Sequence, residues 1–216
     1  MSKQKNSHRL VPMNYLETDN QNRLFAFNSW RDYLPYLLIL AVIAAAIFEL
    51  HWQGRIWWCK WDALYYLWSN DAWGKHNSQH LFDPYSFTHI LHGFFFYWVL
   101  TLIFRRRLPL KWLLFCAIFV ESAWEMLENT DSIIQQYRTA TLALNYFGDS
   151  VVNSFGDILS CAVGFIIARK LGFWRSFAVF IFIEIVLIFW IHDSLLINII
   201  MLIHPVEAIK TWQSGN

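Results

Sequence analysis

Charged residues are scarce in this chain. Asp, Glu, Lys and Arg make up 15 % of its 216 residues, against about 25 % in soluble domains. The formal net charge is only +1, which excludes a strongly basic nucleic-acid-binding protein. Hydrophobic residues instead reach 56 % and aromatic residues 19 %, with 13 tryptophans, and tryptophan gathers where a membrane meets water. The composition therefore predicts a membrane protein.

Cysteine is also scarce, and its three positions share no short motif. Cys116 and Cys161 lie in apolar runs, where a thiol behaves as a small hydrophobic side chain, and Cys59 lies alone among tryptophans. The sequence thus predicts neither a disulfide framework nor a zinc knuckle. It contains no Gly-x-Ser-x-Gly, Walker-loop or His-Glu-x-x-His motif. These absences disfavour a serine hydrolase and a nucleotide-driven mechanism.

The start of the chain has no apolar stretch of the kind that a cleavable signal peptide needs, so none is predicted. Residues 1–30 are polar, with many Asn and Gln, and are expected to form a flexible cytoplasmic tail. Residues 31–216 are expected to form a single multi-pass membrane domain, in line with the chain length. No internal repeat is visible.

Five apolar runs are long enough to cross a membrane as helices. They cover residues 34–50, 87–104, 112–128, 149–168 and 176–203. The last run is long enough to bend after crossing, and His192 and Asp193 mark the expected change of direction. Between the first two runs, aromatic residues at helical spacing predict an amphipathic helix lying in the outer interface: Trp57, Trp61, Leu64, Tyr65 and Trp68. The predicted fold is an all-α membrane bundle of about five helices with this interfacial helix.

The positions of Lys and Arg predict the orientation of the bundle. With the amino terminus in the cytoplasm, most of the cations fall on cytoplasmic segments, including the clusters at residues 105–111 and 169–175. The outer segments then hold only Arg55, Lys60, Lys75, Arg138 and Lys210. This asymmetry is typical of a membrane protein whose amino terminus is cytoplasmic, and with five spans the carboxy terminus is periplasmic.

In this orientation, the ionisable residues of the apolar runs gather in one layer below the outer membrane surface. The layer contains His89, His92, Glu121, Glu125, Glu128, Asp149, Asn153, Asp157, His192 and Asp193. Asp149, Asn153 and Asp157 recur every four residues, which predicts one face of a helix, and Gly156 and Gly164 leave room for a second helix nearby. Such residues are costly in lipid and are usually functional. The layer therefore predicts a site.

The residue types in this layer are those that bind a divalent cation or transfer protons. Histidine and carboxylate ligands suit Zn²⁺, Mn²⁺ or Fe²⁺ better than a sulfur-seeking metal, and one such ion would neutralise clustered carboxylates. The predicted ligands are His89, His92, Glu121, Glu125, Glu128 and Asp149. Without a metal, the same groups could act as an acid–base pair or a proton relay. The predicted catalytic residues are Glu125, Asp149, Asn153 and Asp157.

Structural interpretations compete with these predictions. The two histidines could be satisfied core residues, and the three glutamates could pair with neighbours at a helix end. His76, His80 and Asp83 indicate a solvated loop more readily than a metal site. Glu184 lies in the middle of the last run and could be a lone partner for the cluster.

Four stretches resemble an uncharacterised family of small bacterial multi-pass membrane proteins with a domain of unknown function. They are THILHGFFFYW, ESAWEMLEN, YFGDSVVNSFGD and PVEAIKTWQ, and the resemblance covers nearly everything from the first apolar run onward. A looser pattern is similar to the VanZ-like membrane proteins: His92, Glu125, Asp149, Asn153 and Gly156. Glu128 stands where that family has Gln, and Arg138 lies further from Asp149 than the usual Arg. These resemblances imply the fold and the location of the site, and neither implies a reaction.

Taken together, these patterns predict a bacterial inner-membrane protein with a His, Glu and Asp site under the outer leaflet. The site would bind or act on a lipid-linked or envelope substrate. Membrane lipids are expected partners, nucleic acid is not, and the oligomeric state is left open. A small permease or proton-coupled carrier is the first alternative, although carriers usually have midplane polar groups and internal repeats. A non-catalytic assembly or interaction protein is the second.

Overall fold

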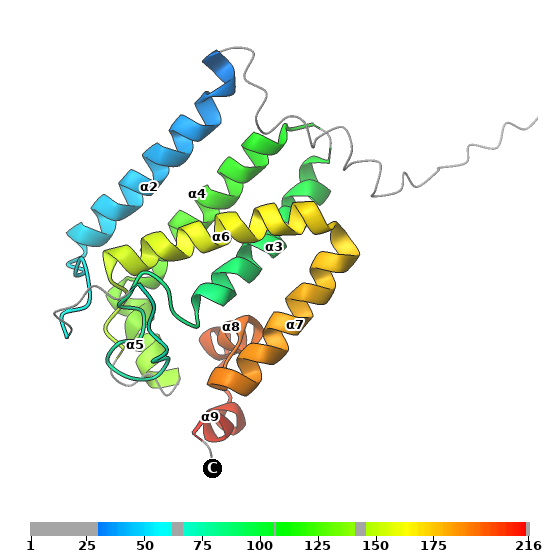
Figure 1. Cartoon of the computed structure of the whole chain (residues 1–216). Coiled ribbons are helices and arrows are strands. Elements are labelled where there is room, and N and C mark those ends of the chain that lie inside the picture. Colours follow the sequence, from blue (N-terminus) through cyan, green and yellow to red (C-terminus); the bar gives the residue numbers. More distant parts are fainter. Residues whose placement is uncertain (1–29, 62–66, 106, 141–145, 215–216) are drawn as a thin grey trace, which may run out of the picture.

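The computed structural model describes residues 30–61, 67–105, 107–140 and 146–214 (Figure 1). These residues form a short 3₁₀ turn, Trp30–Asp32, and eight α-helices joined by loops. The helices are α2 (Leu34–Trp52), α3 (Ser86–Phe104), α4 (Leu110–Glu128), α5 (Asp131–Ala140), α6 (Val151–Leu171), α7 (Phe173–Ile191), α8 (Leu195–Ile203) and α9 (Glu207–Gln213). The predicted all-α fold is confirmed, and the predicted tail lies almost wholly outside the described residues.

Four of these helices are long and apolar enough to cross a membrane: α2 with the preceding turn, α3, α6 and α7. The fifth long helix, α4, also has 19 residues, but it carries Lys111 and three glutamates. It packs against α2, α3 and α6, so its polar face meets protein. The bundle therefore has five long helices, and α4 is the one whose polar residues need partners inside it.

The closest packing in the bundle is between α3 and α6, which cross each other (Figure 1). A β-carbon on Gly93 would come within 2.1 Å of the Cys161 carbonyl oxygen, and one on Gly164 within 2.0 Å of the Ile90 carbonyl oxygen. Only glycine fits at these two positions because any side chain would collide with the opposite backbone. The two glycines thus let α3 and α6 hold their side chains in a common layer.

The described part of the stretch between α2 and α3 does not form the predicted interfacial helix. Its described residues, 53–61 and 67–85, follow an irregular path, while Leu64 and Tyr65 lie outside the described residues. The backbone carbonyls of this loop are used to cap another helix: the Val151 amide donates to the Ile56 carbonyl at 2.8 Å. A regular helix would need those carbonyls for itself. The amphipathic helix at this end of the bundle is instead α5.

The last apolar run bends where the sequence predicts it. α7 ends at Ile191, and His192 adopts a left-handed conformation with φ of 52°. α8 has nine residues, about 14 Å of helix, which is too short to cross a membrane. Glu184 of α7 accepts hydrogen bonds from the amides of Leu195 at 3.0 Å and Leu196 at 3.3 Å. Glu184 therefore caps α8, and its charge also acts on the neighbouring Asp193.

Candidate functional site

Several elements bring ionisable side chains to one end of the bundle. The first turns of α3, the last turns of α4, the start of α6 and the bend between α7 and α8 all contribute. The residues that gather there are His89, His92, Glu121, Glu125, Glu128, Asp149, Asp157 and Asp193. The opposite ends of the helices are mostly apolar. The layer predicted from the sequence is therefore a cluster in three dimensions.

Glu121 lies between the two histidines of α3. The His89 Nδ1 atom lies 2.6 Å from one Glu121 oxygen, and His92 Nδ1 lies 3.1 Å from both oxygens. Glu121 is fully buried. A buried carboxylate needs donors because its charge is costly away from water, and the imidazole N–H groups supply them here.

Glu125, one turn further along α4, lacks such donors. Both of its carboxylate oxygens are buried without a hydrogen-bond partner among the described residues. The nearest basic atom is His89 Nδ1, at 3.3 Å from one Glu125 oxygen. That nitrogen has a single proton to donate and lies closer to Glu121. Glu125 must therefore either carry a proton or face a cation.

His89 also connects the glutamates of α4 to α6. Its Nε2 atom lies 3.8 Å from an oxygen of Asp157. The other Asp157 oxygen accepts a hydrogen bond from the Ser86 hydroxyl at 3.0 Å. One imidazole thus lies between carboxylates of two helices, which suits it to receive a proton from either side or to bind a metal.

The predicted helical face of Asp149, Asn153 and Asp157 is wrong at its first residue. α6 begins at Val151, and Ser150 is its N-cap with an extended backbone, ψ of 153°. Ser150 adopts this conformation because its hydroxyl accepts the free amide of Asn153 at 3.1 Å. Asp149 therefore precedes the helix, although both Asp149 and Asp157 line the same cavity.

Asp149 is held by two residues that the sequence analysis did not single out. It accepts a hydrogen bond from the Asn129 side-chain amide at 2.8 Å and from the Tyr146 hydroxyl at 2.8 Å. Burial raises the pKa of Asp149 above its usual range, although these two donors act in the opposite direction. Asn129 follows the last turn of α4, so it joins α4 to the start of α6.

Asn153 faces the loop before α3 and does not line the cavity. Its amide nitrogen donates to the His80 carbonyl at 2.7 Å and lies 3.4 Å from an Asp83 oxygen. Gly156 belongs to the same contact, because a β-carbon there would come within 1.8 Å of the Leu81 carbonyl oxygen. The segment packed against Gly156 is thus the loop before α3 and not a helix, and Asn153 holds that loop in place.

The ionisable groups surround a cavity of about 750 Å³, the open space at its mouth included. His89, His92, Glu128, Asp149, Asp157 and Asp193 form its polar lining. Trp73, Trp124, Leu195, Ile199 and Leu202 add apolar surface. His192, predicted in the same layer, instead packs its ring against Trp212, with 5.4 Å between ring centroids. The cavity thus combines charged and apolar surfaces.

Three tyrosines of the lining were missed by the sequence analysis. Tyr85 donates its hydroxyl to Asp193 at 3.1 Å, Tyr146 donates to Asp149, and Tyr137 donates to Asn198 at 3.0 Å. Burial and the nearby carboxylates raise the pKa of each phenol well above its usual range, so all three stay neutral donors. Tyrosine is common at membrane interfaces, and its spacing alone does not distinguish a lining residue.

Two overlapping groups of side chains in the cluster could hold a metal ion. One consists of His89, His92 and Glu121, and the other of His89, Glu125 and Glu128. Within each group, one ligand atom per residue lies within 4.8 Å of the others. The unpartnered oxygens of Glu125 fit this interpretation. Asp149, also predicted as a ligand, belongs to neither group.

Comparison with known proteins places the chain in a family. Residues 50–215 match the family model described as "Protein of unknown function (DUF2585)". A UPF0314 protein of Brucella anthropi is 42 % identical over 182 residues, which cover 84 % of this chain and 91 % of that protein. A UPF0314 protein of Rhizobium meliloti is 41 % identical over 185 residues, or 86 % of this chain and 93 % of that protein. No solved structure matches the chain. The chain therefore belongs to the bacterial family described as protein of unknown function DUF2585, with the UPF0314 proteins as its relatives.

Proposed function

We propose that the cluster is a divalent-cation site at which an inner-membrane protein binds and acts on a lipid-linked or other envelope substrate. The observation that carries the proposal is Glu125, a fully buried carboxylate whose two oxygens have no hydrogen-bond partner among the described residues. A group of this kind is costly to keep in a fold unless it serves a ligand. The chemistry of its surroundings indicates which ligand.

Acidic groups outnumber basic ones around Glu125. Glu121, Glu128, Asp149 and Asp157 are its acidic neighbours, and His89 and His92 are the basic groups of the cluster. Even with both imidazoles protonated, negative charge remains in excess in a poorly hydrated region, where repulsion is strong. A bound dication would offset two of these charges and give Glu125 a partner.

The residues of the cluster have distinct roles in this proposal. His89, His92, Glu121, Glu125 and Glu128 would hold the ion, which supplies Lewis acidity and lowers the pKa of a bound water. Asp149 lies on the cavity wall, and burial raises its pKa, which favours a general-acid role toward a substrate. Its bonds from Asn129 and Tyr146 hold the carboxylate in place at the wall.

The apolar side of the cavity supports an amphiphilic substrate. Leu195, Ile199 and Leu202 line it from α8, a helix of almost wholly apolar sequence, LLINIIMLI. Ile199 is also 44 % exposed on the outer surface of the protein, so an acyl chain could pass from the bilayer along α8 while its headgroup meets the carboxylates. The excess of Lys and Arg at the other ends of the helices supports an outer-leaflet location.

The position of the polar groups disfavours the carrier alternative. They gather at one end of the long helices, whereas carriers usually place their binding groups near the midplane between repeated halves. The VanZ-like resemblance rests on five residues, and of these Asn153 and Gly156 hold a loop at the edge of the cluster. That resemblance stays a prediction.

Metal analysis of the protein purified in detergent tests the proposal. We expect Glu125→Gln to lose about one equivalent of bound metal, because one ligand charge is removed while the side-chain volume is kept. When metal-free samples of both proteins are compared, the melting temperature should change little, since a neutral side chain at this buried position is no harder to bury. Glu49→Gln is the matched control: Glu49 lies on α2 and bonds to Gln53 at 3.3 Å. Equal metal content in all three proteins would rule out the cation site.

A further inference from the structure

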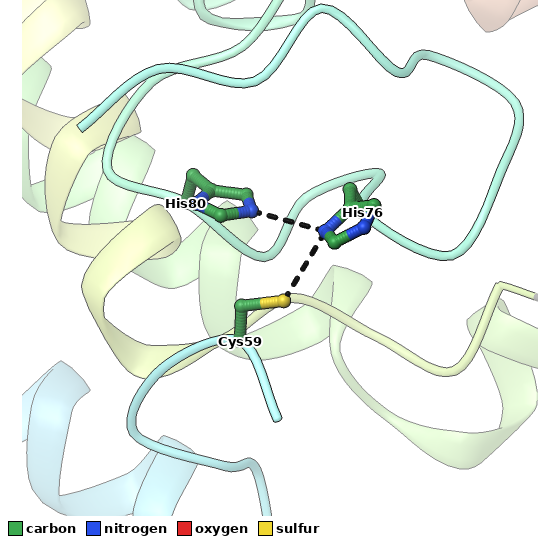
Figure 2. Close-up of side chains that lie close together, drawn as sticks. All are labelled: Cys59, His76 and His80. Carbon is green, nitrogen blue, oxygen red and sulfur yellow. Dashed lines mark hydrogen bonds between the residues drawn. The ribbon is translucent and has the colours of Figure 1, made fainter. Parts of the chain in front are cut away.

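A second group of metal-binding side chains lies apart from the cavity, on the loop between α2 and α3 (Figure 2). Cys59 Sγ lies 3.4 Å from His76 Nδ1, and His76 Nδ1 lies 3.3 Å from His80 Nε2. All three ligand atoms lie within 4.8 Å of one another. Cys59 and His80 are buried, with 5 % and 1 % of their surface exposed. None of the three residues belongs to the groups around His89.

Hydrogen bonding alone accounts poorly for this arrangement. The same nitrogen, His76 Nδ1, makes both short contacts. In the plane of an imidazole ring, each nitrogen presents either one proton or one lone pair. It can therefore make one well-directed hydrogen bond, to the sulfur or to His80, and not two at once. A cation between the three atoms would accept one lone pair from each of them.

Two of the three distances between the ligand atoms fit a tetrahedral zinc ion, and the third, between Cys59 and His80, lies within 4.8 Å. Zinc bonds of about 2.3 Å to sulfur and about 2.05 Å to nitrogen give separations of about 3.6 Å between sulfur and nitrogen and about 3.3 Å between nitrogens. The observed separations are 3.4 Å for Cys59 to His76 and 3.3 Å for His76 to His80. A thiolate with two imidazoles also selects Zn²⁺ over Mg²⁺ or Ca²⁺. We propose that Cys59, His76 and His80 bind a Zn²⁺ ion that joins two segments of this loop.

The loop is already shaped for such a site by bonds that do not involve the three ligands' side chains. Asp71 accepts hydrogen bonds from the amides of Gly74 at 2.7 Å and His76 at 3.3 Å, which tightens the turn that carries His76. Lys60 lies over the ring of Trp61, 4.6 Å from its centroid, beside Cys59 in the sequence. Zinc would thus link residues 55–61 to residues 71–83.

These two segments are the ones that cap α6. The Ile56 carbonyl accepts from the Val151 amide, the Ser78 carbonyl accepts from the Ser150 amide, and the His80 carbonyl accepts from Asn153. Ser78 also lines the main cavity. A zinc ion here therefore stabilises the wall of the cavity without taking part in its chemistry, and the site goes beyond the proposed function.

Cobalt substitution of the purified full chain tests this site. Thiolate-bound Co²⁺ has a charge-transfer absorption band that oxygen and nitrogen ligands do not produce. We expect the band in the wild-type protein and its loss in Cys59→Ser and in His76→Gln, because each removes one ligand. His76 is only half-buried, so His76→Gln should fold even if Cys59→Ser does not, and it tests the same site.

Cys161→Ser is the matched control, because Cys161 is buried in α6 and lies near Glu121 of the other cluster. It should keep the band. A band lost in Cys161→Ser and kept in Cys59→Ser would overturn the proposal, as would a wild-type protein without any band. Trypsin cleavage after Lys75 gives a second readout: zinc should protect the wild-type loop and leave Cys59→Ser unprotected. Equal cleavage of the wild type with and without zinc would also contradict the site.

Discussion

Residues of one type behave differently in this protein according to their immediate contacts. Glu121 and Glu125 lie one turn apart on α4, and both are fully buried. Glu121 receives two imidazole donors, whereas Glu125 receives none. Glu184, on α7, is buried for a third reason, because it accepts the first amides of α8. Burial alone therefore does not distinguish a functional carboxylate from a structural one. The hydrogen-bond donors around the carboxylate make that distinction.

The raised pKa of Asp193 predicts that the free energy of unfolding depends on pH. Burial raises its pKa from 3.8 to about 7, against the opposing bonds from Ser194 and Tyr85. Between these two values the folded protein keeps a proton that the unfolded chain releases, so the free energy of unfolding falls as pH rises from about 4 to about 7. Asp193→Asn should remove this contribution. We expect the melting temperature of Asp193→Asn, relative to that of the wild type, to be higher at pH 8 than at pH 5.

The measurement is a pair of melting curves for each protein at those two pH values. Glu207→Gln, at the start of the short helix α9, is a control on an exposed carboxylate and should show no such gain. A constant difference between Asp193→Asn and the wild type across this pH range would show that Asp193 titrates normally.

At the scale of the element, the helix ends determine where polar groups lie. α6 begins directly after Ser150, whose side chain caps it, and α8 begins directly after Ser194, whose hydroxyl also accepts from a backbone amide. The start of α8 has a second set of acceptors in Glu184. α8 thus depends on a side chain from the middle of α7.

This dependence gives a prediction for α8. Glu184→Ala removes the acceptors of the buried Leu195 amide and the part-buried Leu196 amide, which costs about 1–3 kcal/mol. Glu184→Gln keeps one acceptor oxygen and should lose less. Hydrogen exchange of the Leu195 and Leu196 amides should rise most in Glu184→Ala, while bound metal stays unchanged in both variants. If Glu184→Ala released the metal, Glu184 would instead belong to the cluster.

At the scale of the whole molecule, the cluster depends on several long helices bringing their acidic residues and histidines to the same end of the bundle. The carboxy-terminal end of α4 and the amino-terminal ends of α3 and α6 meet there, together with the bend after α7. The arginine and lysine clusters lie at the other ends of these helices. The molecule is therefore polarised along the direction in which it would cross a membrane.

That polarity predicts the topology. Reporter fusions after Arg107 and Arg175 should be cytoplasmic, and fusions near Asn77 and Arg138 should be periplasmic, because cytoplasmic segments retain Lys and Arg. The measurement is the activity of a reporter that works on only one side of the membrane. A cytoplasmic reporter near Arg138 would contradict the outer-leaflet location of the site.

The sequence by itself determined the class of protein, the number of long helices and the end of the bundle that carries the ionisable groups. These follow from properties that act along the chain: the length of apolar runs, the positions of Lys and Arg, and the spacing of His89, His92 and the glutamates of α4. The bend at His192 was predictable for the same reason, because two polar residues interrupt an apolar run. Membership of an uncharacterised bacterial family was also predictable from four short stretches.

The tertiary structure decided which of those groups meet. Asp149 lies outside α6 because Ser150 caps the helix, and Asn153 turns toward the loop because a carbonyl of residue 80 lies within hydrogen-bond distance. The aromatic stretch expected to be an interfacial helix follows an irregular path in its described part, since its carbonyls cap α6. Cys59 meets His76 and His80 only after that loop folds back. Each of these outcomes depends on a partner distant in the chain, and local spacing carries no information about such partners.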